Sequence, residues 1–380
     1  MNACEITVEE LKALPAGSYQ LIDIRAEDAF AYGGIDGAVN IPLPDIEKAE
    51  LDDALPVILY CKSGVISLPL AEKLTEDGYR AYSLTGGYVE WLRQRLRDKE
   101  DADFARRVEH SIQTTFHKRL FTPFVAAIKE YRLLTPGDRV AVCISGGKDS
   151  MLMAKLFQEL QRHSDFAFEL VFLVMDPGYS AENREIIEHN ARVLNIPITV
   201  FESDIFDAVY SVDKSPCYLC ARMRRGHLYA KAKELGCNKI ALGHHYDDVI
   251  ETVLMGMLYG AQIQTMMPKL KSTNFAGMEL IRPMYYIREA DIKRWRDAND
   301  LGFIQCACRF TDTCTSEACQ RSEKTGSKRQ QVKRLIAQLK ERDPQVEQNI
   351  FRSMYNVNLS TVIAYKDRNG RHHFLDDYDE

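Results

Sequence analysis

One stretch decides the fold of this chain: Arg139-Val140-Ala141-Val142-Cys143-Ile144-Ser145-Gly146-Gly147-Lys148-Asp149-Ser150. Its first half is a short apolar run typical of a buried strand, and the apolar residues after Ser150 predict a helix. A strand that opens into a helix through two glycines presents unpaired backbone amides at the helix N-terminus, where the helix dipole stabilises a phosphate group. The stretch therefore predicts a nucleotide site in an α/β domain.

The glycine turn of this stretch differs from the Walker loop, whose G-x-x-x-x-G-K-[ST] spacing wraps a transferred phosphoryl group. Residues 145–150 instead resemble the PP-loop of the ATP pyrophosphatases. The resemblance implies that these residues bind ATP, with Lys148 and Asp149 acting in catalysis. It also implies cleavage between the α- and β-phosphates, which leaves an adenylate on the substrate. A glycine turn without a ligand is the simpler alternative.

Composition narrows the class of protein. The chain has 380 residues and 46% hydrophobic content, which predicts two or three domains with buried cores. We expect a cytoplasmic protein without a membrane partner, because neither a bilayer-spanning apolar stretch nor a secretory leader stands out. Ten cysteines in such a protein favour metal binding or sulfur chemistry over disulfides. With a net charge of −6, any nucleic-acid site must be a local basic patch.

The domain organisation follows from alternating strand and helix patterns. Apolar runs at 19–24 and 56–60 alternate with helical patterns, which predicts a parallel sheet in residues 1–95. A charged segment then predicts a solvated helical linker over residues 96–134. Residues 135–380 continue the alternation in a doubly wound pattern. The predicted fold class is therefore α/β, with two domains.

Cys61 ends a predicted strand and begins a short loop before a helix, a position where loop amides stabilise a nucleophilic thiolate. Residues 1–95 resemble a single-domain rhodanese, a sulfurtransferase fold, and the resemblance implies a catalytic Cys61 that carries a persulfide. It rests on motifs at 23–25, 35–42, 61–67 and 86–91. An inert buried cysteine is the alternative. A cysteine phosphatase is disfavoured because its loop needs an arginine where Ser67 stands.

The rhodanese-like loop has one notable departure from its family. Ile66 replaces the usual arginine, which would bind a small dianion such as thiosulfate. A persulfide delivered by another protein, such as a cysteine desulfurase, remains compatible with the loop.

Ligands of doubly wound sheets bind at the carboxyl ends of the strands. Asp176, Gly243 and His244 fall at such ends and are predicted to contact ATP. Asp247 and Asp248 place two carboxylates at a helix start, which suits Mg²⁺ bridging carboxylate and phosphate oxygens. The alternative is that these two residues only favour the helix dipole.

Two cysteines begin another predicted helix. Cys217 and Cys220 lie three residues apart, so their thiols share one helix face, and thiolates in a first turn bind soft metals or clusters. A third ligand has two candidates far along the chain, Cys306 and Cys308. Three cysteines leave one iron of a cubane cluster open, whereas four suit a closed zinc site.

Over nearly its full length, the second domain resembles the tRNA 2-thiocytidine synthetases, PP-loop enzymes with an adenine nucleotide alpha hydrolase-like fold. The carrying motifs lie at 145–150, 216–226, 241–248, 267–270, 281–284 and 351–357. The resemblance implies an ATP- and Mg²⁺-dependent enzyme that adenylates the C2 oxygen of an RNA cytidine, in tRNA. Sulfur carried on a [4Fe-4S] cluster, held by Cys217, Cys220 and Cys306, then displaces the adenylate.

The second cysteine segment departs from this family, which has C-x-x-C where the chain has Cys306-Ala307-Cys308. The third ligand therefore stays open between Cys306 and Cys308. Cys314 and Cys319 follow and are predicted to be local thiols, with a persulfide relay or a second metal site as alternatives.

Basic residues near the cysteine helix are candidate RNA contacts, because phosphate contacts position RNA without reading its sequence. Arg222, Arg225 and Lys269 are the predicted contacts. The basic residues at 328–340 have a solvated helix face as their alternative. The oligomeric state is left open, with a homodimer among the alternatives.

The two domains together suggest a hypothesis. Cys61 accepts sulfur from a persulfide donor and passes it to the cluster, while the PP-loop activates the nucleobase. Because both sites belong to one chain, the effective concentration of sulfur donor and acceptor is raised. Two other functions stay open: a PP-loop ligase that adenylates a nucleobase without sulfur, and a protein that removes sulfur from a thiolated nucleobase.

Overall fold

The computed structural model describes residues 4–97, 103–203, 216–304, 328–376 and 378, and the side chains of 216–222 lie outside this description. The chain divides into two compact units. The larger contains Met1–Tyr246 and Met267–Thr325, and the smaller contains Asp247–Met266 and Gly326–Glu380.

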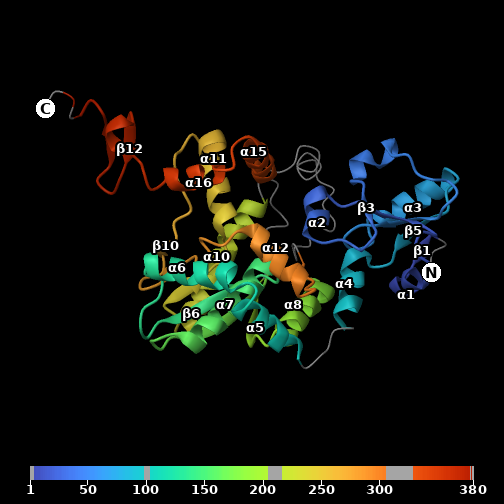
Figure 1. Cartoon of the computed structure of the whole chain (residues 1–380), viewed down its shortest axis with the longest axis horizontal. Coiled ribbons are helices and arrows are strands. Elements are labelled where there is room, and N and C mark those ends of the chain that lie inside the picture. Colours follow the sequence, from blue (N-terminus) through green and yellow to red (C-terminus); the bar gives the residue numbers. More distant parts are fainter. Residues whose placement is uncertain (1–3, 98–102, 204–215, 305–327, 377, 379–380) are drawn as a thin grey trace. The chain divides into compact units, whose positions relative to one another are not determined.

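A five-stranded parallel sheet forms the first domain of the larger unit (Figure 1). Its strands, in the order β1-β5-β4-β2-β3, are β1 (Glu5–Ile6), β5 (Ala81–Leu84), β4 (Val57–Tyr60), β2 (Gln20–Asp23) and β3 (Val39–Asn40). Every residue of β4 is buried, as expected for an interior strand covered on both faces. The accompanying helices are α1 (Val8–Ala13), α2 (Glu27–Tyr32), η1 (Leu43–Lys48), α3 (Ser67–Glu76) and α4 (Gly87–Arg97).

A six-stranded sheet forms the second domain, in the order β10-β11-β9-β6-β7-β8. The strands are β6 (Arg139–Ile144), β7 (Glu169–Asp176), β8 (Ile198–Glu202), β9 (Lys239–Ala241), β10 (Lys269–Lys271) and β11 (Glu279–Ile281). All neighbours are parallel except β10, which runs antiparallel to β11. Because β6 lies between β9 and β7, the strand order reverses at β6, and such a point is where doubly wound sheets bind ligands. The predicted α/β fold class is confirmed.

The second domain also contains the helices α7 (Lys148–His163), α8 (Ala181–Val193), α10 (Pro216–Glu234) and α12 (Glu289–Ala298). The segment predicted as a solvated linker forms α5 (Phe104–Gln113), a π-helical turn η2 (His117–Phe121) and α6 (Thr122–Glu130). Phe104, Val108, Ile112 and Phe124 are buried in a core that also holds residues of both sheets. One face of this segment is therefore buried rather than solvated.

The smaller unit is mainly helical. It contains most of α11 (Tyr246–Gly260), then α15 (Lys328–Arg342), α16 (Val346–Ser353) and η3 (Leu359–Thr361). A two-stranded antiparallel ribbon, β12 (Ala364–Lys366) with β13 (Arg371–His373), lies near its C-terminal end.

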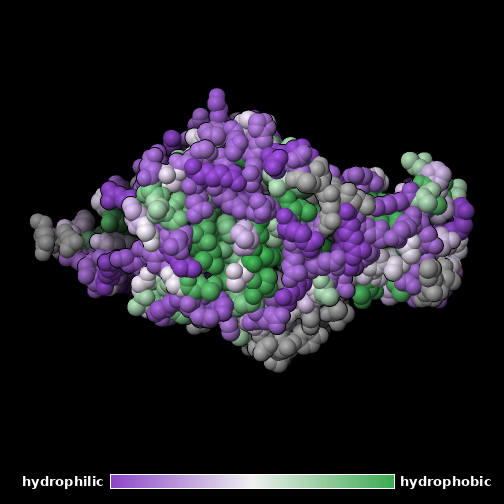
Figure 2. Space-filling model, turned by 90° about the horizontal axis from the view of Figure 1, so that it is seen from below, coloured by the Kyte–Doolittle hydropathy of each residue, from purple (hydrophilic) through white to green (hydrophobic). Residues whose placement is uncertain are grey.

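The surface is mostly hydrophilic on the face shown in Figure 2, where apolar side chains gather in a central area. Within the described ranges, no helix has the length and apolar character needed to cross a membrane.

Candidate functional site

The loop between β6 and α7, residues 145–147, is built around a glycine with positive φ. Gly146 has φ +85°, and a Cβ there would lie 2.5 Å from Cγ1 of Ile187, so only glycine fits. Gly147 is the N-cap of α7 and has no side chain to cap the first helical amides. The Ser150 hydroxyl instead braces the loop, accepting from the Ser145 amide at 3.1 Å and donating to the Gly147 carbonyl at 3.0 Å.

The carboxyl end of β9 lies against this loop. A Cβ on Gly243 would be 3.3 Å from the Ser150 amide nitrogen, so the chain after β9 packs closely on the first turn of α7. His244 follows and donates its backbone amide to the Leu242 carbonyl at 2.9 Å. The ends of β6 and β9 thus meet at the switch point of the sheet.

Asp176, at the end of β7, is buried and organises its own turn. Its carboxylate accepts from the amides of Gly178 at 2.8 Å and Tyr179 at 2.6 Å. Its other oxygen lies 3.3 Å from the Arg184 guanidinium. The side chain therefore has a structural role in this structure, and contact with ATP stays a prediction.

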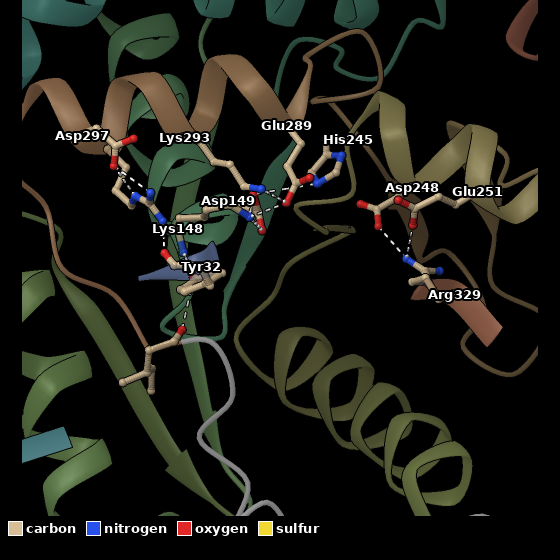
Figure 3. A network of polar contacts seen from close by, with 12 residues as sticks. Tyr32, Lys148, Asp149, His245, Asp248, Glu251, Glu289, Lys293, Asp297 and Arg329 are labelled. Carbon is tan, nitrogen blue, oxygen red and sulfur yellow. Dashed lines mark hydrogen bonds and ion pairs between the residues drawn. The ribbon is translucent and has the colours of Figure 1, made fainter. Parts of the chain in front are cut away.

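A cluster of charged side chains covers the start of α7 (Figure 3). The buried Lys148 ammonium lies 3.0 Å from both Asp149 carboxylate oxygens and 3.5 Å from Glu289. His245 Nε2 lies 4.0 Å from Asp149, and Lys293 Nζ lies 3.5 Å from Glu289. Two carboxylates thus hold the Lys148 charge beside the loop, where it can meet a phosphate.

The first domain also reaches this loop, through Tyr32 at the end of α2. The backbone amide of Lys148 donates to the Tyr32 hydroxyl at 2.9 Å, and that hydroxyl donates to the Ile304 carbonyl at 3.2 Å. The Lys148 ammonium lies 5.0 Å from the Tyr32 ring centroid, a cation–π contact, and Arg296 donates to the Tyr32 carbonyl. Burial and the nearby Asp149 charge raise the pKa of Tyr32, so its hydroxyl stays protonated at neutral pH.

Sequence reasoning missed Tyr32, Glu289 and His245 as neighbours of this loop. Neither Glu289 nor Tyr32 lies in a recognisable sequence motif. Only the folded chain brings them to Lys148. His245 had a usable signal, because it directly follows His244 at the end of a buried strand.

The second loop of interest surrounds Cys61, at the end of β4. Its sulfur is buried and accepts hydrogen bonds from the Gly64 amide at 3.2 Å and the Ser67 hydroxyl at 3.5 Å. Donors aimed at a sulfur accommodate negative charge on it, as a nucleophilic thiolate requires. Val65 and Ile66 in the same loop are exposed, so its rim is apolar where Ile66 stands.

The predicted cluster ligands fall largely outside the described residues. Cys217 and Cys220 lie in α10, so the backbone places them three residues apart in one helix, but their side chains and that of Arg222 lie outside the description. Cys306, Cys308, Cys314 and Cys319 lie wholly outside it. Among the described residues, no group of three or more His, Cys, Asp or Glu side chains could hold a metal.

Two of the predicted RNA and magnesium residues, Lys269 and Asp248, pair with other residues of the chain. Lys269 lies 3.1 Å from Glu279 and donates to the Arg132 carbonyl at 2.9 Å, whereas Arg225 is exposed on α10. Within the smaller unit, Asp248 lies 2.6 Å from Arg329 (Figure 3). Asp247 precedes it in the first turn of α11.

The glycine turn at the switch point of a doubly wound sheet, with a thiol loop in the preceding parallel sheet, defines a PP-loop protein with a sulfurtransferase-type first domain. Family models agree: the PP-loop domain matches residues 112–310, and the rhodanese-like domain matches residues 7–94.

Curated relatives identify the family within this class of PP-loop proteins. The chain is 35% identical over 249 residues to the tRNA-cytidine(32) 2-sulfurtransferase of Alkalilimnicola ehrlichii, covering 65% of this chain and 75% of that protein. It is 33% identical over 272 residues to the protein of the same name from Anaeromyxobacter dehalogenans, covering 69% and 89%. The chain therefore belongs to this family of PP-loop enzymes, which confirms the resemblance found in its motifs.

One solved structure is also similar in part. The U34-tRNA thiolase NcsA from Methanococcus maripaludis, solved with its [4Fe-4S] cluster, aligns with a TM-score of 0.47 at 19% identity. The alignment covers 68% of this chain and 82% of that one.

Proposed function

We propose that this chain is an ATP-dependent sulfurtransferase that replaces the C2 oxygen of a cytidine in tRNA with sulfur. Membership of the tRNA-cytidine(32) 2-sulfurtransferase family supports the substrate class. The observation that carries the proposal is the loop at residues 145–147, where Gly146 with its positive φ and the start of α7 place backbone amides and Lys148 at the switch point of the sheet.

In the first step, the C2 oxygen attacks the α-phosphorus of ATP, and the bond to the β-phosphate breaks to release pyrophosphate. The amides at the start of α7 and the Lys148 ammonium stabilise the negative charge that develops on the phosphate oxygens. Mg²⁺ is the expected counterion for the phosphates, with Asp247 and Asp248 as its candidate carboxylates. Asp149 and Glu289 keep the Lys148 ammonium in place beside the loop.

A [4Fe-4S] cluster, when bound, would supply the sulfur that displaces AMP from the activated base. Cys217 and Cys220 suit it because α10 carries them one turn apart. Cys306 is the third candidate ligand, and it follows Ile304 by two residues. A Cβ on Gly147 would lie 3.7 Å from the Ile304 carbonyl oxygen. Ile304, the last described residue before this segment, therefore lies beside the nucleotide loop.

Cys61 would feed sulfur into this reaction. A persulfide on Cys61 transfers its outer sulfur to an acceptor thiolate, which breaks the S–S bond and leaves Cys61 as a thiolate stabilised by the Gly64 amide and Ser67 hydroxyl. The outer sulfur must gain two electrons to become the thiocarbonyl sulfur of the product, so a dithiol reductant is part of the reaction. Arg222, Arg225 and Lys269 remain the proposed contacts to RNA phosphates.

The test combines two measurements on protein purified without oxygen. We expect AMP and pyrophosphate to form in step with 2-thiocytidine in tRNA, as quantified by nucleoside mass spectrometry. A protein that releases AMP without thionucleoside would contradict the proposal and favour a ligase.

The relay is tested with Cys61→Ala. With limiting persulfide donor, the variant should thiolate tRNA at least about tenfold more slowly than the unaltered chain, because it lacks the accepting thiolate. Excess sulfide should restore the rate, since sulfide bypasses Cys61. Cys143→Ala is a matched control, because burial raises the pKa of that core thiol to about 12 and makes it unreactive. Equal rates for Cys61→Ala and the unaltered chain at limiting donor would refute the relay.

A further inference from the structure

The start of α7 is capped by a residue from the other domain. Gly147 offers no side chain for this purpose, and the Lys148 amide donates instead to the Tyr32 hydroxyl at 2.9 Å. Tyr32 is the last residue of α2 in the rhodanese-like domain. A hydroxyl from the rhodanese-like domain thus accepts the hydrogen bond of a backbone amide in the nucleotide loop.

The position matters because a phosphate bound at this loop needs the same donors. An amide hydrogen forms one well-directed hydrogen bond, so a phenol oxygen at 2.9 Å and a phosphate oxygen compete for it. A phosphate oxygen carries charge and makes the stronger bond. The ring also lies over the Lys148 ammonium, at 5.0 Å from its centroid, so phosphate and Tyr32 share that cation as well.

We propose that the rhodanese-like domain contributes Tyr32 to the nucleotide site, where its hydroxyl caps the Lys148 amide and yields it to a phosphate oxygen when ATP binds. Tyr32 is thus a positioning residue that acts through Lys148. This inference rests on the proposed binding of ATP at residues 145–150.

The Tyr32 side chain can move without separating the two domains, because other contacts hold them together. Arg93 and Arg97 of α4 lie 2.5 and 2.9 Å from Glu185 of α8. Leu92 packs so closely on Gly302 that a Cβ there would lie 2.4 Å from its side chain. Displacement is therefore expected to be confined to the end of α2.

Competition at one amide has a reciprocal consequence. If ATP must displace the Tyr32 hydroxyl, the hydroxyl weakens ATP binding, and ATP loosens the contact of α2 by the same factor. The same hydroxyl donates to the Ile304 carbonyl, two residues before Cys306. Occupancy of the nucleotide loop would therefore also change the hydrogen bond to the Ile304 carbonyl.

The test measures binding of α,β-methylene-ATP with Mg²⁺ to the full chain by titration calorimetry. Tyr32→Phe keeps the ring and removes the hydroxyl, so it should bind the analogue about two- to tenfold more tightly, the range expected for one hydrogen bond. Tyr131→Phe is the control, because it removes a phenol hydroxyl that pairs with Tyr286 at 2.5 Å instead of with the loop. Its affinity should be unchanged.

Hydrogen exchange on the unaltered chain gives a second readout that does not depend on a variant. Peptides covering residues 27–33 should exchange faster when the analogue is bound, because the cap at Tyr32 has been released. Equal or weaker binding by Tyr32→Phe, or slower exchange in α2 on binding, would overturn the inference while leaving the proposed function intact. Failure of the unaltered chain to bind the analogue would overturn the proposed function, and the inference with it.

Discussion

The Cys61 loop and the loop at residues 145–147 both follow an interior strand of a mostly parallel sheet and both lead into a helix, yet they satisfy their polar groups differently. Around Cys61, the donors to sulfur come from Gly64 and Ser67, within the loop itself. At the start of α7, the Lys148 amide is paired with Tyr32, 116 residues earlier in the chain. The two donors to the Cys61 sulfur thus come from its own loop, whereas the first amide of α7 finds its partner through tertiary structure.

The strongest way to break the phosphate loop is Gly146→Ala. Positive φ costs an alanine about 1–2 kcal/mol, and the new Cβ would collide with Ile187 at 2.5 Å, so the loop must shift. We expect affinity for an ATP analogue to fall roughly thirtyfold or more, as measured by calorimetry, with Cys61 persulfide formation retained. Gly137→Ala is the matched control, because Gly137 also has positive φ but a Cβ there has open space. Similar ATP affinity in both variants would refute the role assigned to close packing of Gly146 on Ile187.

The corresponding change in the thiol loop is Gly87→Ala. A Cβ there would lie 2.6 Å from the Cys61 carbonyl oxygen and 2.7 Å from the Gly64 amide nitrogen, both backbone atoms that cannot rotate away. Persulfide formation on Cys61, followed by peptide mass spectrometry, should slow roughly tenfold, while ATP binding is preserved. Gly78→Ala shares the positive φ without the collision and should keep a reactive Cys61. Loss of ATP binding in Gly87→Ala would show that the two loops are not independent.

Acid should weaken the sheet of the phosphate loop through Glu279 on β11. Burial opposes its ionisation, but hydrogen bonds from Lys239 at 2.5 Å and Lys269 outweigh it and lower the pKa of Glu279. Because the folded pKa lies below the unfolded value of about 4.3, this stabilisation is present above that pH and is lost as pH falls through the folded pKa.

Glu279→Gln provides the measurement for this acid effect. It should lower the free energy of unfolding by about 1–3 kcal/mol at pH 7 and by less below pH of about 4, as determined by chemical denaturation. Asp103→Asn is a control, since the Arg106–Asp103 pair is exposed and worth little. An equal loss of stability for Glu279→Gln at both pH values would contradict the assigned ion pairs.

The prediction with the smallest expected effect concerns support of the phosphate loop by the first domain through α8. Glu185 forms ion pairs with Arg93 and Arg97 of the first domain. Ile187, two residues later on α8, packs against Gly146. Because this ion pair is partly exposed, Glu185→Gln should cost only about 0.2–1 kcal/mol of stability and less than about fivefold in ATP affinity. Thermal unfolding and calorimetry measure both quantities. A larger drop in affinity than in Gly146→Ala would reverse the expected order of importance.

Local signals were sufficient for much of this molecule. The buried run before Ser145 predicted β6, and the run before Cys61 predicted β4, because a strand covered on both faces must be apolar throughout. The motifs also predicted the enzyme family, which the curated relatives confirm. The charge pattern over 96–134 predicted a solvated segment, but one face of α5 is buried. The spacing of its apolar residues decides that face, and its charge does not.

The sequence by itself determined where the two loops lie, since an apolar run followed by two glycines, or by Cys61, is a pattern of a few adjacent residues. Only the tertiary structure decided what surrounds the phosphate loop: Tyr32 from one domain, Glu289 from a later helix, and Ile304 from the chain beyond it. The physical reason is that hydrogen bonds and ion pairs between distant residues depend on how elements pack. They impose no periodicity or spacing on the sequence near either partner.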